Sequence, residues 1–98
     1  MPKVLKYVQL NLTELRALDG ENTIFLLAVS PIEAHGPHLP VGTDIFVAKD
    51  LQKRYIDAIT KAYPNFTTVV LPELFCGADA LPVGGSLSVR GAALEAVV

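Results

Sequence analysis

The hydrophobic and polar positions change their period along the chain, and each change predicts a new element. A continuous apolar run from Thr23 to Val29 is bounded by polar residues and does not alternate. Such a run predicts a β-strand covered on both faces, as in a parallel sheet that lies between helices. A second run, residues 66–71, is rich in β-branched residues and predicts another core strand.

Between these two runs the apolar positions recur three or four residues apart, which is the spacing of one helix face. These positions are Ile45, Ala48, Leu51, Tyr55, Ile59 and Ala62. Charged residues separate them and Tyr63-Pro64-Asn65 follows, so we expect one long helix over 45–62. Strand, helix and strand in this order predict one βαβ unit, right-handed if its two strands are parallel in one sheet.

Two shorter segments flank this unit. Residues 11–18 predict a short helix that Asn11 or Thr13 caps, with Leu12 and Leu15 on its buried face. Residues 92–98 begin another apolar helix. Two core strands and one complete helix cannot cover a parallel sheet on both faces. We therefore expect a fragment of a larger domain, or a fold that another chain completes.

Composition and charge narrow the class of protein. Of the 98 residues, 51% are hydrophobic and 18% are charged, which is enough to bury a core. The net charge is -2 with no basic run, so we expect no nucleic-acid partner. The longest apolar stretch is too short to cross a bilayer, and the first ten residues do not form a signal peptide. One cysteine, Cys76, excludes a disulfide within the chain. We expect a soluble, cytoplasmic protein with a small-molecule substrate and no membrane partner.

Candidate chemistry lies directly after the first predicted strand. Glu33, His35, His38 and Asp44 fall within twelve residues that also hold several prolines and glycines. Residues two apart on an extended segment point the same way, so Glu33 and His35 can face one point. Asp44 lies at the start of the long helix, where negative charge is favoured. Carboxylates and imidazoles are ligands of zinc and manganese, and open α/β sheets bind ligands where their strands end.

Each of these residues also has a structural interpretation that the spacing leaves open. Asp44 or Thr43 can serve as a helix cap. Glu33 can be a solvated loop residue, and His35 can be a packed loop histidine. His38 can contact a metal or substrate, but we favour a supporting role in which it orients Asp44 or the loop.

The segment 30–44, SPIEAHGPHLPVGTD, closely resembles the pattern of the creatininase (creatinine amidohydrolase) family, a strand followed by G-S-x-E-x-H-G-P-H-L-P-x-x-T-D. A weaker similarity lies at 85–89, GSLSV, where the family has G-T-x-S-L. The order of elements also matches across nearly the whole chain. The resemblance implies an α/β fold, a three-layer α/β/α sandwich with a mostly parallel sheet that is incomplete in this chain. Residues 1–98 would be the N-terminal part of a single creatininase-like domain.

The resemblance further implies a site with two divalent metal ions, zinc and/or manganese, or iron. Glu33 would bind one ion, His35 the other, and Asp44 would bridge them. Such a centre cleaves a non-peptide C–N bond of a cyclic amide or formamide by a metal-activated water. The alternatives are a relative that cleaves peptides, and a non-catalytic truncated remnant or binding module. Family members form oligomers, so the resemblance also implies a homo-oligomer.

Three departures from the family pattern limit this expectation. Ser30-Pro31 replaces the usual Gly-Ser pair, and the loop from Gly77 to Gly84 lacks the usual histidine. No histidine follows Asp44, whereas the family takes further ligands from a downstream N-G-H segment. The chain therefore supplies about half of the ligands of the metal centre, and we do not expect it to catalyse alone. Its sequence identifies no catalytic proton donor. Ser86 and Ser88 can line the site, but we interpret them as ordinary serines at a strand end.

Overall fold

A computed structural model describes residues 3–78 and 84–97, so most of the loop from Gly77 to Gly84 lies outside the described residues. The chain divides into two compact units, and each is described by itself. The first unit comprises Met1–Ala28 and Leu51–Glu73, and the second comprises Val29–Asp50 and Leu74–Val98. The expectation that the chain is part of one domain stays a prediction.

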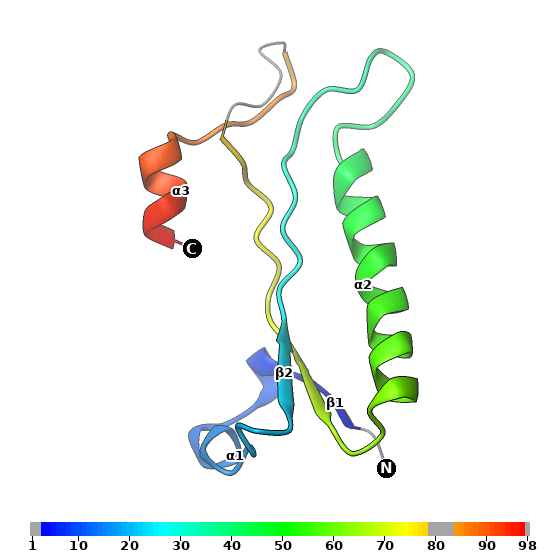
Figure 1. Ribbon diagram of the computed structural model, residues 1–98. Coiled ribbons are helices and arrows are strands. Elements are labelled where there is room, and N and C mark those ends of the chain that lie inside the picture. The colour runs from blue at the N-terminus through cyan, green and yellow to red at the C-terminus, as the bar shows by residue number, and fades with distance from the viewer. Residues whose placement is uncertain (1–2, 79–83, 98) are drawn as a thin grey trace. The chain divides into compact units, whose positions relative to one another are not determined.

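The first unit is built on a three-stranded sheet in the order β1-β3-β2 (Figure 1). Its strands are β1 (Lys3–Lys6), β2 (Thr23–Leu26) and β3 (Thr67–Val70). Both pairings are parallel, and Thr23 lies opposite Thr67 in the register of β2 and β3. The predicted α/β class and parallel sheet are therefore confirmed. The sequence pattern did not predict β1 or the 3-10 turn η1 (Tyr7–Gln9) that follows it.

The core of the described residues lies on the central strand β3. Thr68 and Val69 are both fully buried. Because neighbouring residues of a strand point to opposite faces, both faces of β3 are covered, as predicted for a core strand. The same expectation is wrong for β2, where Phe25 is 50% exposed. β2 is an edge strand of this sheet, so fewer neighbours surround its side chains.

The short helix α1 (Leu12–Arg16) has the predicted cap. The backbone N–H of Glu14 donates to Asn11 Oδ1 at 2.8 Å, and the Asn11 N–H donates to Glu14 Oε1 at 3.2 Å. This reciprocal pair is a capping box. The predicted burial of Leu12 is wrong, since its side chain is 59% exposed, whereas Leu15 is half-buried. A helix of little more than one turn forms no continuous apolar face.

The long helix α2 (Thr43–Ala62) confirms the predicted helix and begins two residues earlier. Its first turn forms where the Phe46 N–H donates to the carbonyl of Gly42. The predicted apolar face is only partly covered, because Leu51 and Tyr55 are exposed. A chain of this size leaves a large share of its apolar surface in contact with solvent. The last helix, α3 (Gly91–Val97), matches the predicted C-terminal helix. Among the described residues, every helix is too short or too polar to cross a membrane.

Candidate metal centre

All the predicted ligands belong to the second unit, in the segment that leads from the end of the sheet into α2. The start of this segment is held by pairing with Leu74. Val29 forms a parallel bridge with Leu74, and the N–H of Ser30 donates to the carbonyl of Leu74 at 3.2 Å. Ser30 is buried, with 4% of its surface exposed. Val29 and Ser30, which lie four and three residues before Glu33, are therefore held by a neighbouring strand-like segment.

The residues around Glu33 and His35 continue this pairing with a second segment. Ile32 forms an antiparallel bridge with Leu87, whose N–H donates to the Ile32 carbonyl at 2.9 Å. This pairing keeps the backbone extended. Side chains two positions apart then share a side, which is the orientation that Glu33 and His35 need to reach one ion.

The structure brings Glu33, His35 and Asp44 together. One ligand atom from each residue can be chosen so that all three atoms lie within 4.8 Å of one another. His35 Nε2 lies 3.2 Å from Asp44 Oδ1. Two ligands of one tetrahedral zinc ion, each about 2.05 Å from the metal, are separated by roughly 3.3 Å. The residues present therefore fit a divalent ion in both ligand type and spacing.

Both ring nitrogens of His35 face oxygen atoms. Nδ1 lies 2.9 Å from the backbone carbonyl of Glu33, and a carbonyl can only accept, so Nδ1 must carry a proton. Nε2 then faces the Asp44 carboxylate, which favours a proton or a cation between them. The Glu33 carbonyl, followed by the charges of Asp44 and Glu33, raises the pKa of His35 above its usual value, against an opposing contribution from desolvation. Histidine ligands of metals commonly donate their second ring N–H to a carbonyl in this way.

Asp44 reaches this cluster from the first turn of α2. Its side chain is 34% exposed and that of His35 is 24% exposed, so both remain accessible to solvent. The contact with His35 shows that Asp44 does more than occupy the start of a helix.

His38 lies outside the cluster. Its ring is exposed, and among the described residues it does not belong to the group that can hold an ion. Instead it lies beside Gly36, where an added Cβ would be 3.3 Å from both Nδ1 and Cε1 of His38. That His38 orients Asp44 or the loop stays a prediction.

Replacement of Gly36 by alanine is expected to lower the free energy of unfolding by about 1 to 2 kcal/mol, because Gly36 has a φ of +79° that L-residues avoid. The crowding against His38 adds to this cost. Since Gly36 is bonded to His35, we also expect weaker zinc binding. Denaturant unfolding and calorimetric titration measure the two effects. Gly20→Ala is the control, since nothing lies within 4 Å of its added Cβ. Equal losses for both variants would contradict the strain argument.

Two contacts near this segment were not predicted from the sequence. The Ala34 N–H donates to Ser86 Oγ at 2.9 Å, and Lys49 Nζ lies 5.8 Å from the ring centroid of Phe75. One feature of the sequence pointed to Ser86, the weaker family similarity at residues 85–89. The contact of Lys49 with Phe75 had none, because it joins residues far apart in the sequence.

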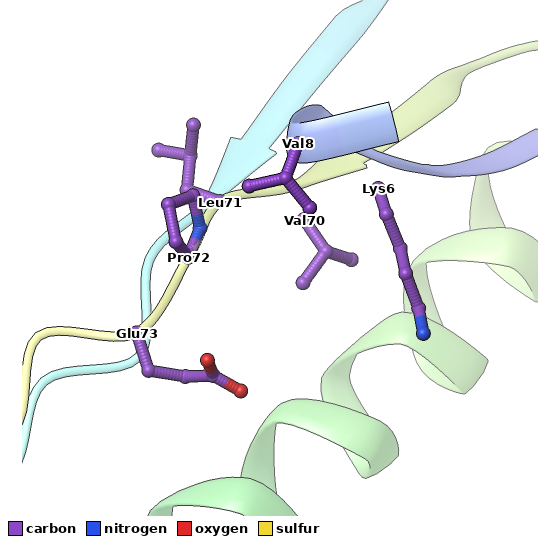
Figure 2. Close-up of a pocket in the computed structure, with 6 residues that line it drawn as sticks. All are labelled: Lys6, Val8, Val70, Leu71, Pro72 and Glu73. Carbon is purple, nitrogen blue, oxygen red and sulfur yellow. The ribbon is translucent and has the colours of Figure 1, made fainter. Parts of the chain in front are cut away.

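A separate hollow of about 250 Å³ lies in the first unit, at the carboxyl ends of β1 and β3. Figure 2 shows its lining residues, Lys6, Val8, Val70, Leu71, Pro72 and Glu73. None of the predicted site residues is among them. The hollow is therefore distinct from the candidate metal centre in its residues.

The family model of creatininase, described as creatinine amidohydrolase, matches residues 8–98 of this chain. The solved structure of a mutant creatininase superposes with a TM-score of 0.72 at 21% sequence identity. The match covers 97% of this chain and 37% of the creatininase, so the chain spans little more than a third of that protein's length. No curated protein sequence matches this chain. Members of the matched family generally bind a divalent metal ion.

Proposed function

This chain belongs to the creatininase family, and we propose that it supplies part of the two-metal centre of a hydrolase that cleaves a non-peptide C–N bond. The substrate class is a small cyclic amide or a formamide. The observation that supports the proposal is the cluster of one imidazole and two carboxylates, with ligand atoms within 4.8 Å of one another. Two-metal hydrolases use such mixed nitrogen and oxygen ligands.

Each of the three side chains has a distinct role in this proposal. Glu33 would hold one ion, His35 would hold the second, and the Asp44 carboxylate would contribute to both. When bound, the ions supply a hydroxide near neutral pH and polarise the amide carbonyl. The Glu33 carbonyl keeps the proton of His35 on Nδ1 and so presents Nε2 to the site. Zinc, manganese and iron all accept this ligand set.

The number of protein ligands available to each metal ion limits what this chain can do alone. With Asp44 shared, each ion has two protein ligands, one fewer than the three that a catalytic zinc ion usually has. We therefore expect the chain to bind metal without catalysing hydrolysis, and its catalytic proton donor stays unknown. We further propose a small-molecule amide as partner, a cytoplasmic location and self-association into a homo-oligomer, as the family resemblance implies.

A chimeric enzyme tests this proposal. The segment of a creatininase that this chain matches is replaced by the chain itself, since the two folds superpose over 97% of it. We expect the chimera to hydrolyse a cyclic amide in the presence of zinc or manganese and to lose this activity with a chelator. A chimera that carries His35→Ala should fold and remain inactive. If the His35→Ala chimera hydrolysed the amide as fast as the chimera with His35, then His35 would be excluded from the metal centre.

A further inference from the structure

The strongest unassigned contact near the candidate metal centre joins Ser86 to the backbone between two proposed ligands. The N–H of Ala34 donates to Ser86 Oγ at 2.9 Å across 52 sequence positions. Ala34 lies between Glu33 and His35. We propose that Ser86 is a positioning residue that holds this ligand-bearing segment in the conformation that metal binding requires. The inference rests on the proposed function above.

The hydroxyl of Ser86 extends the backbone pairing by one step. Leu87 pairs with Ile32 through a backbone hydrogen bond of 2.9 Å. Ala34 lies two residues after Ile32, so its N–H points to the same edge of the extended segment as the Ile32 carbonyl. At this position the hydroxyl of Ser86 accepts the hydrogen bond, in the place that a backbone carbonyl would take in a regular β-ladder. Because hydrogen bonds of an extended segment lie in its plane, this contact does not involve the side chains of Glu33 and His35.

The chain turns before Ser86 and pairs with other segments after it. Gly85 has a φ of +92°, a conformation that glycine adopts without strain, and it turns the chain directly before Ser86. After Leu87, the N–H of Val89 donates to the carbonyl of Gly77 at 3.0 Å. Ser86 is also half-buried. A hydroxyl beside a paired segment can act as an anchor, because less chain entropy remains to be lost when its hydrogen bond forms.

The required property is an acceptor on the β-carbon. Alanine removes the acceptor and leaves the Ala34 N–H without its partner, while threonine keeps the hydroxyl and favours extended backbone. We therefore expect Ser86→Ala to weaken zinc binding by about tenfold, as is typical when a partner that orients a metal ligand is lost. Ser86→Thr should restore the affinity to within about twofold of the original. A purely structural role would lower stability without this rescue of affinity.

Two measurements on the full chain test the inference, calorimetric titration with Zn²⁺ and amide hydrogen exchange without metal. In Ser86→Ala the Ala34 amide should exchange at least tenfold faster, and Ser86→Thr should restore its protection. Thr60→Ala is the control, since this hydroxyl donates within α2 to the carbonyl of Asp57 and should affect neither measurement. Unchanged exchange at Ala34 in Ser86→Ala would overturn the inference.

The two measurements also separate this inference from the proposed function. If the unmodified chain takes up no zinc, the proposed metal centre fails, and hydrogen exchange at Ala34 still decides whether Ser86 holds the segment. If the unmodified chain binds zinc and Ser86→Ala binds it equally well, the metal centre stands and the positioning role is overturned.

Discussion

Replacement of His35 by alanine is expected to weaken zinc binding by about 100-fold or more. The four ligands of a structural zinc site together contribute 10–16 kcal/mol, so one ligand accounts for roughly 3 kcal/mol. His35 is the single nitrogen ligand of the cluster and lies 3.2 Å from Asp44 Oδ1. Asp44→Asn should have a similar effect, because it removes the charge of the bridging carboxylate while nearly keeping its shape. Competition with a fluorescent chelator at pH 7 measures both affinities.

His38→Ala is the matched control for this experiment. It removes the same side chain only three positions away, but that ring is exposed and lies beside Gly36 rather than in the cluster. We expect its zinc affinity to fall by less than tenfold. If His38→Ala lost more affinity than His35→Ala, the assignment of ligands would be wrong. If neither variant lost affinity, the cluster would be a polar loop contact and no metal centre.

The proximity of the three proposed ligands was predictable because it depends on local geometry. Glu33 and His35 are two residues apart on an extended segment, and Asp44 is placed by the start of a helix whose period is visible in the sequence. The partner of Ala34 was not predictable in this way. Ser86 lies 52 positions away, and its hydrogen bond depends on the pairing of two segments that the sequence does not join. The position of His38 depends likewise on the positive φ of Gly36.

The fold shows the same division between local and non-local information. The parallel pair of β2 and β3 and the helix between them follow from hydrophobic period and length. β1 was missed because only two apolar residues, Val4 and Leu5, lie between lysines, and its pairing with β3 supplies the rest of its stability. The exposure of Leu51 and Tyr55 was also unpredictable. A hydrophobic period identifies an apolar face, but it does not show whether another part of the protein covers that face.

Replacement of Val69 by alanine is expected to lower the free energy of unfolding by about 2 kcal/mol. Val69 is fully buried on the central strand, and the change removes the equivalent of two methylene groups at about 0.8 kcal/mol each and leaves a small cavity. Val4→Ala is the matched control, because Val4 lies on the edge strand β1 and is 48% exposed. Its loss should stay below about 1 kcal/mol, since only part of the same area leaves solvent on folding. Urea unfolding followed by circular dichroism measures both. Equal losses of unfolding free energy in the two variants would mean that β3 is not the centre of the core. If the folded Val69→Ala variant also bound zinc more weakly, the metal centre would depend on the sheet as well as on its own loop.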